Sequence, residues 1–217
     1  MKKLLVIAII LSFTILLTAC GSQNHDGFAG YDEIETRFIS ASFPVYESIE
    51  HLSNNSTDII RVIVLEERSE FINTWLPPEN ELEDTGMGSY DAYFLFTVHR
   101  LEVVETFKGY AVQGDIIEIK QFGGQADGLR IVYLDAAPLS YGDDLILFLR
   151  DHGAEGIPTV LTNPLQSAYR FAPLGEGMRS LDADSELESI NAQNDLTLTI
   201  NDLIHITNLF GHIQSND

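Results

Sequence analysis

Six histidines are the side chains in this sequence best suited to acid–base or metal chemistry. No two of them stand at the close spacing of metal ligands on one helix or strand. The sequence also lacks a G-x-S-x-G elbow, an H-E-x-x-H pair and a P-loop. We therefore expect each histidine to be structural or exposed, and we predict no catalytic residue, no metal site and no cofactor, although folding could still bring distant ones together. The histidines are His25, His51, His99, His152, His205 and His212.

The stretch DADSELE at 182–188 has some of the spacing of a calcium loop. Asp182, Asp184 and Glu186 occupy positions 1, 3 and 5 of an EF-hand pattern. Position 6 requires glycine but is Leu187, and position 12 requires glutamate but is Gln193. A solvated acidic loop over 176–195 is therefore favoured over a calcium site.

A long connection at 69–93 carries the only tryptophan, Trp75, which is followed by Leu76-Pro77-Pro78. Loops of this length are usually functional or disordered, and loop aromatics are common recognition anchors. Trp75 is therefore a candidate interaction residue. The alternative, which we favour, is that Trp75 folds back onto the core.

The only cysteine, Cys20, lies between an apolar run and a loose polar one. A basic head, Lys2-Lys3, precedes the apolar residues 4–17, and small residues follow, which is the pattern of a secretory signal. The run is shorter than the roughly 20 residues of a membrane-spanning helix. We expect residues 1–19 to be a signal peptide.

Leu17-Thr18-Ala19-Cys20 resembles the lipobox of bacterial lipoproteins. In that family a diacylglycerol is joined to the cysteine sulfur, and the chain is cut just before it. The resemblance implies lipidation of Cys20, with palmitate-type acyl chains holding the protein at the extracytoplasmic face of the cell membrane. Two acyl chains meet the requirement for stable anchoring. An ordinary signal peptide with an incidental cysteine is the alternative.

The remaining body is strongly acidic. Removing residues 1–19 takes Lys2 and Lys3 from the 12 basic residues and none of the 33 acidic ones, which leaves 10 against 33 and a formal charge of −23. Nucleic-acid binding requires basic residues that neutralise phosphates, so we predict no nucleic-acid partner. With Cys20 acylated, no thiol is left for a disulfide, a zinc site or a nucleophile.

The apolar pattern predicts a β-rich body. Residues 20–30 form a polar tether, and a helix is expected near 44–52, beginning at Pro44. A second helix is expected at 198–211, with Thr199 and Asp202 as a capping pair. Gly123-Gly124 is interpreted as a turn. The β-branched and aromatic runs predict strands at 58–67, 91–107, 114–122, 129–134, 144–150 and 157–162, with a further one at 167–174.

The order of these runs resembles the netrin-like barrel shared with tissue inhibitors of metalloproteinases. The matching parts are "STDIIRVIVLEE", then "FTVHRLEVVETFKGYAVQGDIIEIKQFGG", then "PLSYGDDLILFLR". The resemblance covers about residues 56–150 and implies a small OB-like β-barrel. Those inhibitors chelate the protease zinc through a free N-terminal cysteine. Because Cys20 is predicted to be acylated, that mechanism does not carry over.

Together these observations predict a mainly β protein with an OB-like barrel and flanking N-terminal and C-terminal helices. The predicted parts are a signal peptide (1–19), a lipid-anchored tether (20–30), a helix and barrel domain (31–175), and an acidic loop with a C-terminal helix (176–217). The predicted function is non-enzymatic binding of an unknown protein or small ligand at the membrane. A modulator or inhibitor of a secreted enzyme and an envelope hydrolase are the alternatives.

Overall fold

The computed structural model describes residues 34–74, 93–136, 138–153, 159–171 and 182–210. The chain divides into two units, Met1–Glu33 and Ile34–Asp217, and all described residues belong to the second. The predicted signal peptide, Cys20, the tether and Trp75 lie outside the described residues.

Five strands close into a small barrel, which confirms the predicted mainly β, OB-like fold. The strand order is β7-β2-β3-β4-β8, and a direct pairing of β7 with β8 completes the ring. Closure leaves no open sheet edge on the ring itself. The strands are β2 (Asp58–Asn73), β3 (Tyr93–Lys108), β4 (Ile116–Phe122), β7 (Asp144–Arg150) and β8 (Thr159–Leu161).

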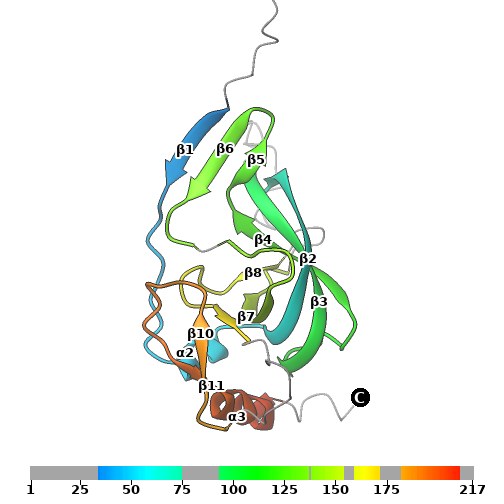
Figure 1. Ribbon diagram of the computed structural model, residues 1–217, viewed down its shortest axis with the longest axis vertical. Helices are drawn as coiled ribbons and strands as arrows, with labels where there is room; N and C mark the ends of the chain where they lie inside the picture. The colour runs from blue at the N-terminus through cyan, green and yellow to red at the C-terminus, as the bar shows by residue number, and fades with distance from the viewer. Residues whose placement is uncertain (1–33, 75–92, 137, 154–158, 172–181, 211–217) are drawn as a thin grey trace, which may run out of the picture. The chain divides into compact units, whose positions relative to one another are not determined.

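The strands β2 and β3 are long enough to serve both sides of the barrel, and they bend to do so (Figure 1). Their register shifts at three places, between Ile59 and Ile60, between Arg61 and Val62, and between Val64 and Glu66. Each shift is a bulge or irregularity, and bulges sharpen local twist and bend a strand. Strand β3, which the sequence predicted at 91–107, is therefore bent along its length.

Strand alternation divides the apolar residues into two clusters. Ile60, with the valines and leucines of β2, β3 and β7, fills the barrel interior. Its neighbour Ile59 points the other way, into a cluster with Phe148 and Leu203 that the helices cover. The C-terminal helix α3 (Ile200–Phe210) lies across this outer cluster and buries Leu203 and Ile206.

Side-chain capping fixes where the two helices α2 and α3 begin. Thr199 Oγ1 accepts a hydrogen bond from the backbone N–H of Asp202 (3.1 Å), and the carboxylate of Asp202 accepts one from the N–H of Thr199 (2.8 Å), as predicted. The prediction of a helix from Pro44 is wrong in its start. Helix α2 (Ile49–Asn54) is capped by Ser48, whose Oγ accepts from the N–H of His51 (3.1 Å).

A second, three-stranded sheet stands beside the barrel, in the order β1-β6-β5 (Figure 1). Its strands are β1 (Glu35–Ile39), β5 (Gly124–Ala126) and β6 (Leu129–Tyr133), and β1 runs parallel to β6. The sequence did not predict β1. Four of its five residues are exposed on both faces, so β1 lacks the alternating apolar pattern of a buried strand.

Short strands extend the barrel sheet beyond β7: β9 (Ala168–Arg170), β10 (Glu186–Ser189) and β11 (Leu198–Thr199). The prediction of a loop over the whole of 176–195 is therefore wrong for β10. Leu187 is the reason, because its side chain is buried in the outer cluster while the acidic residues around it stay exposed. Backbone pairing with β9 and β11 holds the strand together with this apolar anchor.

Two buried amides join the segment before α2 to the body. Gln166 accepts from the N–H of Tyr46 (2.8 Å) and donates to its carbonyl (3.0 Å). Asn163 Nδ2 donates to the carbonyl of Pro44 (2.7 Å). Both side chains are at most 2 % exposed, so these contacts fix the path of residues 44–46.

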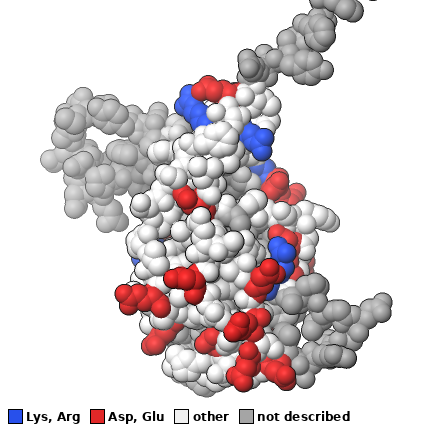
Figure 2. Space-filling model, turned by 60° about the vertical axis from the view of Figure 1, so that its left-hand side comes forward, with Lys and Arg blue, Asp and Glu red and all other residues white. Residues whose placement is uncertain are grey.

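Charge is spread unevenly over the surface. Acidic side chains outnumber basic ones on the face drawn in Figure 2 and gather over its lower half, whereas basic side chains stand nearer the top. None of the helices within the described ranges combines the length and the apolar character needed to cross a bilayer.

Candidate functional site

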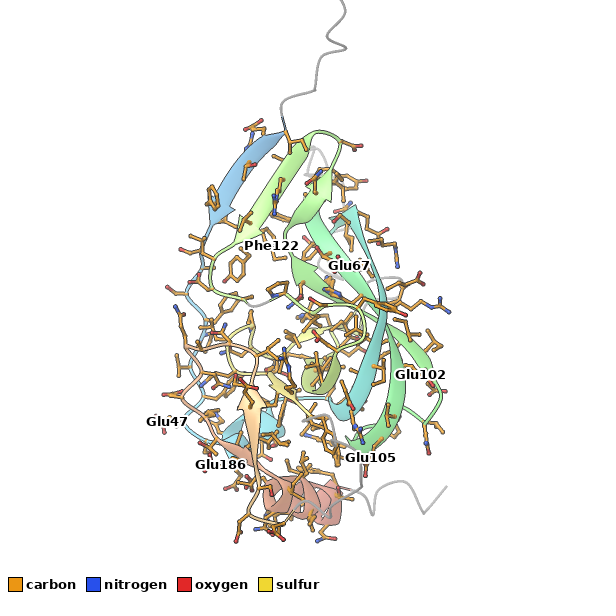
Figure 3. The ribbon with its side chains drawn as sticks, viewed as in Figure 1. Glu47, Glu67, Glu102, Glu105, Phe122 and Glu186 are labelled. Carbon is orange, nitrogen blue, oxygen red and sulfur yellow. The ribbon has the colours of Figure 1, made fainter. Side chains whose placement is uncertain are left out.

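A pocket of about 510 Å³ lies between the polar end of the barrel and the β5–β6 hairpin. One wall comes from β2, β3 and β4, and the other comes from β6. Figure 3 labels Glu67 and Phe122, which both lie in this upper half of the molecule. The lining residues are Glu67, Arg68, Ser69, Thr97, His99, Gln121, Phe122, Gly123, Gly124, Gln125, Arg130, Ile131, Val132, Tyr133, Ala136 and Pro138.

The pocket continues the barrel interior. Thr97, His99, Leu101 and Val103 alternate along β3 and so share one face. Leu101 and Val103 belong to the apolar interior cluster, while Thr97 and His99 line the pocket. The interior therefore changes from apolar to polar along a single face, and the polar end is the pocket.

Gly123 and Gly124 allow the chain to cross closely over this end. Their φ angles are +100° and +134°, which side chains rarely adopt. A Cβ on Gly124 would lie 2.5 Å from Ser69 Oγ and 2.8 Å from Thr97 Oγ1. Two hydrogen bonds hold the crossing, from Thr97 Oγ1 to the carbonyl of Gly123 and from the N–H of Gln125 to Ser69 Oγ, both 3.0 Å. The prediction of a turn at Gly123-Gly124 is wrong, because Gly124 begins strand β5; the two glycines form an extended crossing that is the roof of the pocket.

His99 is the most deeply buried polar side chain of the pocket, with 1 % of it exposed. Its Nε2 lies 3.0 Å from Oε1 of Gln121, which also accepts from the N–H of Leu139 (3.4 Å). Because an accepting oxygen faces Nε2, this nitrogen is the donor and Nδ1 carries the lone pair. Burial lowers the pKa of His99, which favours the neutral ring.

The Nδ1 atom of His99 is buried and has no hydrogen-bond partner in the described part of the chain. The nearest charged group is Glu67, whose Oε2 lies 3.9 Å away, beyond hydrogen-bonding distance. The Glu67 side chain is 57 % exposed, so one member of the pair is buried and the other faces solvent. A buried polar atom without a partner is rare in folded proteins and marks a place where a ligand or water can bind.

Two aromatic rings form the apolar side of the pocket. Phe122 and Tyr133 meet edge to face, with ring centroids 6.3 Å apart. Phe122 also contacts Phe96 (5.2 Å) and Phe94 (5.6 Å), which lie behind the pocket lining. Tyr133 donates to the carbonyl of Ala41 (3.4 Å), and burial raises the pKa of its hydroxyl. The rings therefore have fixed positions.

The two guanidinium groups at the pocket differ in their partners. Arg68 binds Glu118 through two nitrogens (2.6 and 2.9 Å) and Glu70 more loosely (3.3 Å). Arg130 is exposed on β6 and makes no ion pair with any described residue. Its charge is therefore available to a molecule in the pocket.

The polar groups of the pocket differ in how far they are already engaged. The Ser69 and Thr97 hydroxyls are engaged with backbone groups, and within the described ranges no hydroxyl lies within hydrogen-bonding distance of His99. A nucleophile paired with a base is the usual sign of covalent catalysis. The pocket instead offers an accepting nitrogen, a carboxylate, two rings and a guanidinium.

The other predicted candidates lie apart from the pocket or outside the description. Trp75, Cys20, His25 and His212 are not among the described residues. His51 of α2 packs edge to face against Tyr46, with the ring centroids 5.2 Å apart, and His152 and His205 are exposed. Asp182 and Asp184 are exposed before β10, and across the described ranges no group of three or more His, Cys, Asp or Glu side chains could hold a metal ion.

The sequence predicts a structural or exposed His99 and does not single out Glu67, Gln121 or Arg130. The usable signal was the replacement of apolar by polar residues on the inward face of two neighbouring strands, at Thr97 and His99 and again at Gln121. Comparison with protein-family models and with curated protein sequences gives no match, so the argument for function rests on this pocket.

Proposed function

We propose that this protein is a lipid-anchored binding protein of the extracytoplasmic membrane face, which takes a small molecule into the His99 pocket without transforming it. The observation that carries the proposal is the buried, unpartnered Nδ1 of His99. Leaving such an atom unsatisfied costs about 1–3 kcal/mol. A ligand that donates to Nδ1 recovers that free energy, whereas a histidine that only packs in the core has no use for the vacant lone pair.

The pocket has the size and lining that small-ligand sites share. Such sites measure about 300–1,000 Å³ and combine apolar walls with a few well-placed polar groups. Here Phe122 and Tyr133 supply the apolar wall, and His99, Glu67 and Arg130 supply the polar groups. These features support a small molecule over a large protein partner as the occupant.

The proposed location at the membrane is inferred from the N-terminal residues of the sequence. Lipidation at Cys20 would hold the body at the membrane, and the polar residues 21–30 would let it stand away from the surface. A body charge of −23 is repelled by anionic lipids and nucleic acids, so the lipid would be the membrane attachment.

Binding is tested with the full chain in lipid nanodiscs, screened for compounds that raise the unfolding temperature and then measured by calorimetry. His99→Gln removes the proposed acceptor, and His205→Gln is the matched control because His205 is exposed on α3. We expect hits to bind wild type and His205→Gln equally and His99→Gln at least about tenfold more weakly. If His99→Gln does not fold, Glu67→Gln replaces it, since Glu67 is largely exposed. Hits that bind all variants equally would overturn the assignment of the pocket.

The anchor is tested separately with an alkynyl fatty acid fed to cells. Wild type should be labelled and should partition with membranes, whereas Cys20→Ala should be unlabelled. Equal labelling of both forms would refute lipidation while leaving the pocket unaffected.

One observation favours the alternative of an envelope hydrolase, namely a carboxylate beside a histidine in a concave site. Hydrolysis of chromogenic acetate esters that depends on both Glu67 and His99 would support it. The alternative of a modulator of a secreted enzyme depends on Trp75 and stays a prediction, because Trp75 lies outside the described residues.

A further inference from the structure

The chemical class of the ligand can be argued from the contacts of the pocket. The starting point is a pair of acceptors, His99 Nδ1 and Glu67 Oε2, which lie 3.9 Å apart. The hydrogen bond of Nε2 to Gln121 leaves Nδ1 with a lone pair, and a carboxylate only accepts. Neither atom can satisfy the other, so a donor from outside is needed to satisfy both.

The charge of the site selects the kind of donor. Burial lowers the pKa of His99 and keeps its ring neutral near pH 7, so Glu67 gives this end of the pocket a negative charge. A cationic donor is favoured over a neutral one because charge-assisted hydrogen bonds are roughly twice as strong. An ammonium group has three donors and can bind both acceptors at once. The neighbouring rings of Phe122 and Tyr133 also attract a cation.

Arg130 is the charged group of the pocket that indicates what the second end of the ligand carries. Arg68 is neutralised by Glu118 and Glu70, whereas Arg130 makes no ion pair with any described residue. Arg130 lines the pocket, and a guanidinium group can bind a carboxylate through two parallel hydrogen bonds. A ligand with only a cationic end would be repelled by Arg130, and one with only an anionic end would be repelled by Glu67.

We propose that the pocket binds a short peptide of two or three residues, whose terminal ammonium group donates to His99 Nδ1 and Glu67 and whose carboxylate meets Arg130. This inference rests on the proposed function, since it names the ligand class of the same pocket. A volume of about 510 Å³ suits a molecule of this size.

Three matched probes separate the two ends: phenylalanyl-phenylalanine, its N-acetyl derivative and its C-terminal amide. Calorimetry at pH 7.5 with the full chain in nanodiscs should find the unmodified dipeptide tightest. Acetylation removes the ammonium group and should weaken binding at least about tenfold, as loss of a charge-assisted hydrogen bond does. Amidation removes the carboxylate and should weaken binding by a similar factor.

Variants then assign each end to its residue. In Glu67→Gln acetylation should weaken binding less than it does in wild type, because only the hydrogen bond of the ammonium group to His99 Nδ1 remains. In Arg130→Gln the unmodified and amidated dipeptides should bind with nearly equal affinity. Glu102→Gln is the control because Glu102 is an exposed glutamate of β3 in the lower half of Figure 3, away from the pocket lining. It should leave all three affinities unchanged. Glu67 and Arg130 are largely exposed, so their variants are expected to fold.

The outcomes separate this inference from the proposed function. Acetylated dipeptide binding as tightly as the unmodified one, or dipeptide binding unaffected by Glu67→Gln, overturns the peptide assignment. If none of the dipeptides binds but other compounds bind in a His99-dependent manner, the inference fails and the proposed function stands. If no compound depends on His99, both fail.

Discussion

Glu67 and His99 are direct cross-strand partners in the β2–β3 ladder, yet Oε2 of Glu67 and Nδ1 of His99 stay 3.9 Å apart. Opposed residues in an antiparallel pair are close enough to interact. The hydrogen bond is missing because neither Nδ1 nor the carboxylate carries a proton to donate. The lone pair of Nδ1 faces a carboxylate oxygen, and a proton on Nδ1 would turn this repulsion into an ion pair. The pair therefore responds to pH in a direction that can be worked out.

The first prediction concerns acid stability. The folded-state pKa of His99 lies below its ordinary value of about 6.5, so the unfolded chain binds a proton there before the folded chain does. Stability should therefore fall as pH drops below about 6.5, until the folded-state pKa is passed. Glu67 opposes the shift, and Arg68, Arg130 and Tyr133 are the other titratable groups of the pocket. Urea unfolding between pH 7.5 and 5 measures the slope.

His99→Gln should lose this component of the slope, while the exposed His205→Gln should keep it. An unchanged acid slope in His99→Gln would mean that another group causes it.

The second prediction concerns the roof of the pocket. Gly124→Ala should cost about 3 kcal/mol of unfolding free energy, because it combines an unfavourable φ with a clash against Ser69 and Thr97. Gly128→Ala has a positive φ of +76° but no atom within 4 Å of its Cβ, and should cost only about 1 kcal/mol. Adding Ser69→Ala to Gly124→Ala should recover part of the loss. Equal costs for the two glycines would show that the crossing is less close than described.

The third prediction concerns Tyr169, which is fully buried and accepts from Asn194 Nδ2 (3.0 Å). Burial raises its pKa to about 12, so the unfolded chain loses the proton first and stability is lost as pH rises from about 10 towards 12. Tyr169→Phe should cost about 1–2 kcal/mol at pH 7 and flatten the alkaline loss. Tyr141→Phe, at an exposed position, should do neither. Chemical denaturation from pH 7 to 11 decides between them.

The fourth prediction compares two ion pairs. Arg61 binds Asp144 through two nitrogens (2.8 and 2.6 Å) and stacks on Phe171 (3.7 Å from the ring centroid). Lysine cannot reproduce either contact, so Arg61→Lys should cost about 1–2 kcal/mol. Arg100 makes a single exposed contact with Glu66, and Arg100→Lys should stay within about 0.5 kcal/mol of wild type. Similar losses for both variants would contradict the larger stabilisation assigned to the partly buried Arg61–Asp144 pair.

The barrel could be predicted from the sequence because its strands alternate and are separated by turn residues. The segments 114–122 and 144–150 carry enough β-branched and aromatic residues to identify a strand without tertiary information. Strand β1 could not be predicted, because its exposed residues owe their conformation to hydrogen bonds with β6, almost a hundred residues later. Local patterns do not contain such a pairing.

The pocket was missed for a related reason. His99 and Gln121 belong to different strands, and their contact depends on the β3–β4 register, in which Gln121 pairs with Thr97. The bulge between Val64 and Glu66 also has to shift β2 by one residue before Glu67 can face His99. Regular pairing without this bulge would place Glu67 on the face of β2 that points away from His99.

The parallel pairing of β1 with β6 has a mechanical consequence. Glu35–Ile39 is the first described strand, so tension on the N-terminal part of the chain reaches the body through it. A pull along β1 loads its five register pairs in shear, together rather than one after another. If the pairing of β1 with β6 broke, the hydrogen bonds of Asn163 to Pro44 and of Gln166 to Tyr46 would bear the load next. The fold therefore places two successive mechanical stops between the start of the chain and the barrel.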